Sequence, residues 1–231
     1  MPSLFSGRPS EARGARSFTI RRGRRGPQKE HALGVLVPQL SISPSLHVAD
    51  FERAFGRNGP LIIDVGFGAG ATTLALAQHH QNANVIGIET HENGLAMLAH
   101  EATERGLDNI RLIAGDAFDV MANMVEIASV QIIQLVCPDP WPKQAQSHRR
   151  LFSSDFARMC ADRLVAGGEL RLATDSTPYA DHMLRVASAE QLLVNAYDGF
   201  APRHPERPTT TYERKGLAAG RAMQELLFRR R

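Results

Sequence analysis

Short apolar runs alternate with longer stretches of mixed polarity from residue 61 onward. Runs rich in Val, Ile and Leu predict buried strands at residues 61–68, 84–89, 110–116, 130–137 and 169–174. The stretches that follow them predict helices at residues 71–80, 91–106, 117–127, 151–168 and 178–188. Such alternation of strand and helix builds a parallel sheet with helices on both of its faces.

The end of the chain departs from this alternation. Residues 192–197 and 221–228 predict two further strands, and a segment rich in Pro and Thr joins them in place of a helix. Two strands joined in this way predict an antiparallel hairpin at the edge of the sheet. The predicted fold class is therefore α/β, with a mostly parallel seven-stranded sheet and a C-terminal antiparallel hairpin.

Charge is distributed unevenly, although the net charge of the 231 residues is only +3. Residues 1–30 hold eight Arg or Lys against two Glu, residues 203–231 hold eight against three acids, and residues 31–202 hold eleven against nineteen. An acidic body with two basic ends suits a polyanionic partner such as a nucleic acid. We therefore expect a flexible basic N-terminal arm (residues 1–30) and one domain (residues 31–231). A mitochondrial transit peptide is the alternative for the arm.

The two cysteines, Cys137 and Cys160, form no CxxC pair. Reduced cysteines of this kind predict a cytoplasmic protein without a zinc site. No apolar run approaches the ~18 residues of a membrane-spanning helix, so we expect no membrane partner and no metal.

Acidic residues follow the predicted strands at the points where ligands bind in open α/β sheets. They are Asp64, Glu89, Asp116, Asp139 and Asp175. A cluster of acids disfavours a pyrophosphate and favours a cationic cofactor such as S-adenosyl-L-methionine (SAM). In this interpretation Glu89 accepts from the ribose hydroxyls, Asp116 from the adenine amino group, and Asp64 holds water or the amino group of the ligand.

Three glycines, Gly66, Gly68 and Gly70, follow the first strand and let the backbone turn tightly beside a ligand. Their spacing also fits a dinucleotide-binding loop, with Glu89 about 20 residues further on. A nicotinamide oxidoreductase is therefore one alternative function.

The segment Pro138-Asp139-Pro140-Trp141 follows the fourth strand and contains the only tryptophan. The two prolines fix backbone φ angles, so Asp139 is directed one way at little entropic cost. In methyltransferases that act on DNA amino groups, a similar Asp/Asn-Pro-Pro-aromatic segment holds a flipped base against its ring. The segment predicts a nucleobase substrate and leaves an exocyclic amino group open as the methylated atom.

Several motifs in order along the chain resemble the bacterial tRNA (guanine-N7)-methyltransferase family. They are RSFTIRRGRRGPQKEHAL, CPDPWPKQ with SHRRLF, LATDSTPYADHML and RPTTTYERKG, and the resemblance runs from about residue 17 to the end. The resemblance implies a Rossmann-like class I methyltransferase fold, SAM as cofactor and tRNA as partner. It also implies methyl transfer to N7 of a guanosine in the variable loop (position 46), by a monomer or a homodimer.

The same resemblance assigns roles to individual residues. The implied cofactor-binding residues are Asp64, Glu89, Asp116 and Asp139, beside the glycines Gly66, Gly68 and Gly70, and Asp139 is also the implied catalytic residue. The implied substrate-binding residues are Lys143, Asp175, Thr210, Thr211, Tyr212 and Glu213. Two positions depart from the family pattern, because Pro142 stands where His is usual and Thr211 where Lys is usual. These departures leave a catalytically weak, RNA-binding relative as an alternative.

The chemistry of guanine N7 sets what the protein must supply. N7 carries a lone pair and needs no base, so the requirement is to align it with the sulfonium methyl. A carboxylate can accept from guanine N1–H and N2–H, and we expect Asp139 or Asp175 to do so, with Glu213 as a further acceptor. Basic residues near the site are expected to meet tRNA phosphates. They are Lys143, His148, Arg149 and Arg150, with Arg203, His204, Arg207, Arg214 and Lys215 on the terminal segment.

Overall fold

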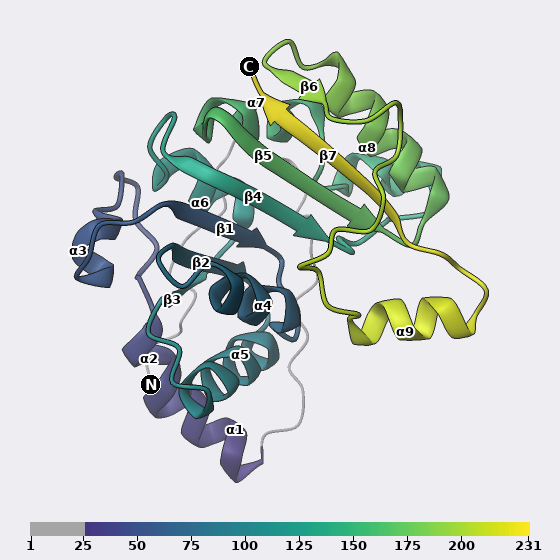
Figure 1. The fold of residues 1–231 in the computed structure, drawn as a ribbon. Helices are drawn as coiled ribbons and strands as arrows, with labels where there is room; N and C mark the ends of the chain where they lie inside the picture. Colours follow the sequence, from purple (N-terminus) through teal and green to yellow (C-terminus); the bar gives the residue numbers. More distant parts are fainter. Residues whose placement is uncertain (1–25) are drawn as a thin grey trace.

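Seven strands form one sheet in the order β3-β2-β1-β4-β5-β7-β6 in a computed structural model that describes residues 26–231, the Gln144 side chain excepted (Figure 1). The strands are β1 (Leu61–Val65), β2 (Asn84–Glu89), β3 (Ile110–Ala114), β4 (Val130–Val136), β5 (Leu164–Thr174), β6 (Leu193–Asn195) and β7 (Gln224–Arg230). β1 to β5 pair in parallel, and β7 pairs antiparallel with both β5 and β6. The predicted fold class is confirmed.

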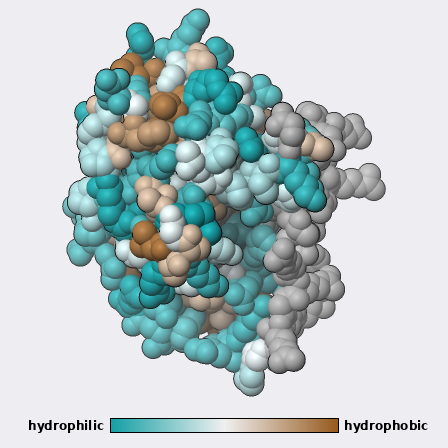
Figure 2. Space-filling model, turned by 90° about the vertical axis from the view of Figure 1, so that its right-hand side faces the viewer, coloured by the Kyte–Doolittle hydropathy of each residue, from teal (hydrophilic) through white to brown (hydrophobic). Residues whose placement is uncertain are grey.

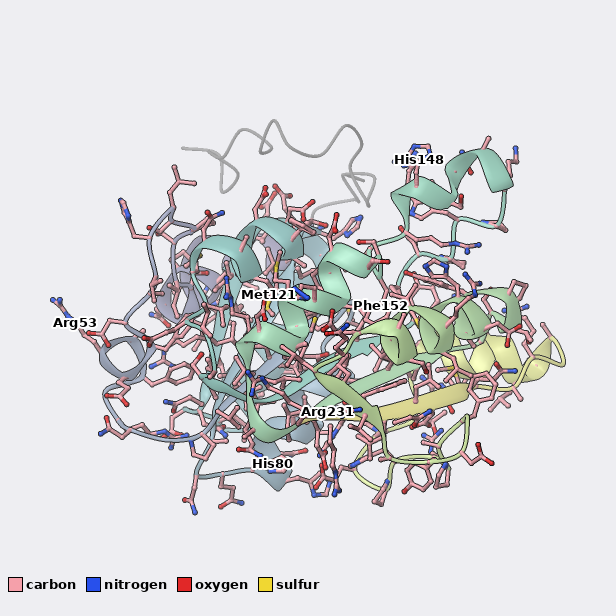
Figure 3. All side chains as sticks on the ribbon, turned by 90° about the horizontal axis from the view of Figure 1, so that it is seen from above. Arg53, His80, Met121, His148, Phe152 and Arg231 are labelled. Carbon is pink, nitrogen blue, oxygen red and sulfur yellow. The ribbon has the colours of Figure 1, made fainter. Side chains whose placement is uncertain are left out.

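Helices cover both faces of the sheet (Figure 1), and alternating side chains of β1 to β4 enter two separate cores. On one face lie α4 (Ala71–His79), α5 (Glu92–Glu104) and the continuous N-terminal stretch of α1 (Pro27–His31), η1 (Ala32–Leu36) and α2 (Val37–Leu40). On the other lie α6 (Ala117–Asn123), α7 (Ser154–Arg163) and α8 (Thr177–Ala189). The view from above places Met121 and Phe152 on this second face and His80 on the first (Figure 3). The small helix α3 (Phe51–Phe55) precedes β1.

The helix predicted at residues 151–168 is shorter than expected. It ends at Arg163, and β5 begins directly at Leu164. Leu164 pairs with Val130 but Glu169 pairs with Ile132, so four residues of β5 are accommodated opposite one residue of β4. Gly167 lies at φ +77°, a conformation that glycine adopts readily. The glycines therefore shape an irregularity inside the strand rather than the end of the helix.

A helix also interrupts the segment that was predicted to have none. α9 (Thr211–Ala218) stands between β6 and β7, away from the sheet (Figure 1). Thr210 caps it, since its Oγ1 accepts from the Glu213 N–H at 3.1 Å. This Thr-x-x-Glu spacing is a helix-start signal that outweighs the neighbouring threonines and prolines.

Residues 1–25, most of the expected basic arm, lie outside the described residues. Pro27 to Glu30, the end of that arm in the sequence analysis, belong to α1. Gln28 hydrogen bonds to His100 of α5 at 2.8 Å, so this part packs on the domain. Within residues 26–231, no helix has both the length and the apolar character needed to cross a membrane.

Candidate active site

The carboxyl ends of β1 to β5 meet at one edge of the sheet, because these strands are parallel neighbours. Each strand brings one of the predicted acids to this edge. They are Asp64 on β1, Glu89 on β2, Asp116 after β3, Asp139 after β4 and Asp175 after β5. The acids differ in burial and in partners, which separates them into distinct roles.

The glycine loop after β1 turns through left-handed conformations. Gly66, Gly68 and Gly70 have φ angles of 65°, 59° and 87°. A Cβ on Gly70 would lie 2.8 Å from Cβ of Leu98, whereas Cβ atoms on Gly66 and Gly68 would meet nothing within 4 Å. Gly70 is therefore needed for packing on α5, and the first two glycines leave open space that a ligand can use.

Asp64 points inward from β1 and is fully buried. Its Oδ2 accepts from the hydroxyls of Thr72 and Thr73, both at 2.7 Å, and its Oδ1 accepts from Nε2 of Gln134 at 3.4 Å. Burial raises the pKa of Asp64 to about 6, although these three hydrogen bonds act to lower it. The carboxylate thus holds the first turn of α4 beneath the glycine loop.

Glu89 ends β2 and is buried with its charge well satisfied. Oε2 accepts from the Gly68 N–H at 2.9 Å, and Oε1 accepts from the N–H groups of Thr90 and His91 at 2.6 and 3.0 Å. The His91 ring lies 2.9 Å from the same oxygen. Burial acts to raise the pKa of Glu89, but the bonds from His91, Thr90 and Gly68 outweigh it and lower the pKa. A buried carboxylate at this place stays ionised.

Asp116 caps the helix that follows β3. Its Oδ1 accepts from the Phe118 N–H at 2.8 Å, at the start of α6. The residue is half-buried. It therefore stands at the cofactor edge, next along the sheet from Glu89, with one oxygen engaged by the cap.

The proline-bounded loop after β4 is held by two arginines from the basic stretch. The Arg149 guanidinium lies 3.7 Å from the centre of the Trp141 ring, and Nε of Arg150 donates to the Pro140 carbonyl at 2.9 Å. Both arginines are among the residues predicted to meet phosphates. Their contacts fix the loop, which explains how Trp141 can keep a φ of 40°.

Asp139 and Lys143 of this loop are exposed. The basic stretch that follows forms a short 3₁₀ helix, η2 (Gln144–Arg149). Figure 3 shows His148 on η2, which projects beyond the helices that cover the sheet. The loop thus presents a carboxylate and positive charge to the outside, above a backbone fixed by arginines.

Asp175 follows β5 and lines a hollow of about 560 Å³. The other lining residues are Pro140, Ser176, Thr177, Pro178, Gly220, Arg221, Ala222 and Gln224. Nε of Arg221 donates to Oδ2 of Asp175 at 2.9 Å. The proline loop and the end of β5 therefore face one common pocket.

Cys137 lies at the base of this region with a φ of 52°. Burial, and next the charge of Asp175, raise the pKa of its thiol to about 11. A thiol held protonated at neutral pH is not a nucleophile.

Four of the six substrate-binding residues implied by resemblance lie at the start of α9. Thr210 is its cap, Thr211 is exposed, and Tyr212 is 70% exposed. Glu213 is buried, and its carboxylate pairs with Arg203 and with Arg207. Burial acts to raise the pKa of Glu213, but these two arginines outweigh it and lower the pKa. Its charge is matched by two arginines, so Glu213 is suited to holding α9 rather than to accepting from a base.

Arg207, expected to meet phosphates, is buried instead and lies between Glu213 and Glu225. Arg203 also pairs with Glu213 but remains exposed, as are Arg214 and Lys215. Figure 2 shows the face that carries α8 and α9, where hydrophilic residues surround small, separate apolar patches. The exposed positive charge of the terminal segment therefore comes from Arg203 as well as from Arg214 and Lys215 of α9.

Sequence reasoning missed the pairing of Arg207 with Glu225, and also a second network on the same face of the sheet. There, Glu206 accepts from Arg171 at 2.8 Å and lies 3.0 Å from Nε2 of His80. No local pattern announces these pairs, because their partners come from distant parts of the chain. Within the described residues, no group of three or more His, Cys, Asp or Glu is arranged to hold a metal ion.

The strand order, the glycine loop and the acids at successive strand ends define a class I methyltransferase fold. Solved structures agree on the fold. The 16S rRNA methyltransferase KamB is 15% identical, covers 80% of this chain and 95% of its own, and has a TM-score of 0.58. The aminoglycoside resistance methyltransferase NpmB1 is 16% identical over the same shares, with a TM-score of 0.53.

A family model described as "Putative methyltransferase" matches residues 58–226. A tRNA (guanine-N(7)-)-methyltransferase of Paraburkholderia xenovorans is 38% identical over 96% of this chain and 87% of the relative. One of Leifsonia xyli is 39% identical over 93% of this chain and 95% of the relative. The chain belongs to the tRNA (guanine-N7)-methyltransferase family. This membership favours a methyltransferase over the nicotinamide oxidoreductase.

Proposed function

We propose that this protein transfers the methyl group of SAM to N7 of a guanosine in the variable loop of tRNA. The observation that carries the proposal is the meeting of two features at one edge of the sheet. The first is the glycine loop after β1, which is hydrogen bonded to the buried Glu89 at the end of β2. The second is the Asp139 loop after β4, which borders the pocket lined by Asp175 after β5. Membership of the family supplies the choice of tRNA and of guanine N7.

The residues at the cofactor edge fit SAM. The open space above Gly66 and Gly68 lets a ligand approach the backbone closely. Glu89 is an ionised acceptor next to this space. When bound, SAM supplies a methyl group on a positively charged sulfur. Glu89 would hold the ribose hydroxyls and Asp116 the adenine amino group, in the order in which β2 and β3 lie. The surrounding carboxylates favour a cationic ligand electrostatically.

Orientation of the guanine is the main task of the remaining residues. N7 has a lone pair in the plane of the guanine ring, so no group needs to remove a proton before transfer. Asp139 or Asp175 accepts from N1–H and N2–H and turns N7 toward the methyl group. The exposed Lys143, Arg214 and Lys215 meet phosphates and hold the RNA without reading its sequence. Pro142 and Thr211, the two departures from the family pattern, are both exposed.

Methyl transfer from labelled SAM to an unmodified tRNA transcript tests the proposal. Digestion should give 7-methylguanosine, and a transcript whose variable-loop guanosine is replaced by adenosine should lose it. Label in an exocyclic amino group would indicate an amino-group methyltransferase instead. Binding of tRNA without transfer would indicate a catalytically weak, RNA-binding relative. Asp139→Asn and Asp175→Asn test the orienting carboxylate, with Asp181→Asn on the exposed side of α8 as the matched control. At least one of the two should fall about tenfold or more in rate, and rates like the control for both would remove the orienting role.

A further inference from the structure

Arg207 is a buried arginine that joins two acids from different elements. Its side chain is 2% exposed. Nη1 donates to Oε2 of Glu213 at 2.7 Å and Nη2 to Oε1 at 3.1 Å, a bidentate pair. Nε and Nη2 donate to Oε1 of Glu225 at 2.9 and 2.7 Å. The planar guanidinium therefore ties the first turn of α9 to β7 through fixed hydrogen-bond directions.

The β7 end of this link sits beside the substrate pocket. Glu225 pairs with Ala173 in the sheet, and Gln224 pairs with Thr174, the residue before Asp175. Oε2 of Glu225 accepts from the His204 N–H at 2.8 Å, which also anchors the segment that leads to Arg207. The position of α9 is thus fixed relative to the same strand ends that hold Asp175.

α9 also lies against Asp175 directly, so its placement leaves little tolerance. A Cβ on Gly216 of α9 would lie 2.9 Å from Oδ2 of Asp175. Arg221, just after the helix, donates to that same oxygen. A shift of α9 would therefore displace the surroundings of Asp175 together with Thr211 and Tyr212.

We propose that Arg207 is a positioning residue for methyl transfer, which sets α9 against the Asp175 pocket through Glu213 and Glu225. The inference rests on the proposed function, since it concerns the geometry of that same pocket. A buried ion network is a weak source of stability, because desolvation of its charges offsets their attraction. What bidentate pairing gives is a fixed direction, and Lys cannot supply it with one ammonium point charge.

The test compares Arg207→Lys with Arg111→Lys in the full chain. Arg111 is a part-buried arginine on β3, at the far edge of the sheet, where Nε donates to the Ala54 carbonyl at 3.0 Å. Single-turnover methyl transfer to an unmodified tRNA transcript, dissociation constants for SAM and tRNA, and the folded fraction by circular dichroism are measured for each. For Arg207→Lys we expect a rate about tenfold or more below wild type, per folded molecule, because misplacement of about 1 Å can cost far more. The dissociation constant for SAM should stay within about threefold, and Arg111→Lys should keep the wild-type rate.

A second variant keeps the proposal testable if Arg207→Lys does not fold. Glu225→Gln keeps Arg207 and its pair with Glu213 but weakens the tie to β7, and it should show the same separation of rate from affinity. Rates equal to that of Arg111→Lys, per folded molecule, in whichever of the two variants folds would overturn the proposal. Wild-type protein that transfers no methyl group to tRNA would instead defeat the proposed function, so the two failures are distinguishable.

Discussion

The buried carboxylate of Asp64 gives the most quantitative prediction. Its pKa is raised from 3.8 to about 6, chiefly by burial. A carboxyl group with a raised folded-state pKa stabilises the fold fully below its unfolded pKa, and this contribution is lost as the pH rises through about 6. Over the whole range the change is about 3 kcal/mol, at 1.36 kcal/mol for each unit of pKa. About 1.4 kcal/mol of it falls between pH 5 and pH 8.

Asp64→Asn removes this titration and keeps most of the local bonding. The Asn carbonyl can accept from Thr72 and Thr73, and the Gln134 amide can rotate to accept from the new NH₂ group. The free energy of unfolding, from urea titrations at pH 5 and pH 8, should therefore shift between wild type and variant. Wild type should lose about 1.4 kcal/mol relative to the variant at the higher pH, or about 3–6 °C in Tm.

Glu89→Gln is the matched control, because its carboxylate ends the neighbouring strand with the opposite shift. The pKa of Glu89 is lowered from 4.5, so its contribution to stability is present above that value and is lost only as the pH falls through the lower folded-state pKa. Between pH 5 and 8 the difference from wild type should stay flat. A flat difference for Asp64→Asn as well, or one that grows in favour of wild type at pH 8, would refute the argument that burial outweighs the three hydrogen bonds.

Three further measurements, one of them on Glu89→Gln, test other parts of the site and the core. Glu89→Gln should weaken SAM binding about tenfold in calorimetry, since a charged acceptor adds about 1.5 kcal/mol, and an unchanged affinity would remove Glu89 from the cofactor site. Arg149→Ala removes a cation–π contact worth about 0.5–2 kcal/mol. It should change the emission of the only tryptophan, and an identical spectrum would show that the stacking does not hold Trp141. Phe156→Ala, at a fully buried position edge-on to Phe152, should cost about 3–5 kcal/mol in urea unfolding, and a loss below about 1 kcal/mol would mean that the core closes around the gap.

The sheet was predictable because its strands are short apolar runs bounded by glycines and acids. Residues 84–89 form β2 with the predicted bounds, and the acids of β1 to β5 reach one edge because parallel strands point the same way. The end of α7 was not predictable in the same way. The run after Arg163 carries glycines that end a helix as readily as they make a strand irregular, and only pairing with β4 decides between them.

The partners of the charged residues were the least predictable part of the site. Arg207 and Glu225 are 18 positions apart, and Glu206 and His80 are 126 apart. A basic residue near a polyanion site carries no sign in the sequence of whether it faces solvent or a buried acid. The expectation of phosphate contacts was therefore wrong for Arg207, whose side chain the fold encloses.

Burial divides the acids at the strand ends between architecture and chemistry. Asp64 accepts from hydroxyls of α4, and one oxygen of Asp116 caps α6. Glu213, which lies in α9, pairs with two arginines. Asp139 is exposed, and Asp175 lines the pocket that the proline loop borders. Neutral replacement should accordingly alter stability at Asp64 and the transfer rate at Asp139 or Asp175, and at Glu213 it should lower the rate by loosening the link to Arg207. The carboxylates that face inward fix where the outward-facing pair stands, so under the proposed function the precision of methyl transfer depends on the buried acids as well as on Asp139 and Asp175.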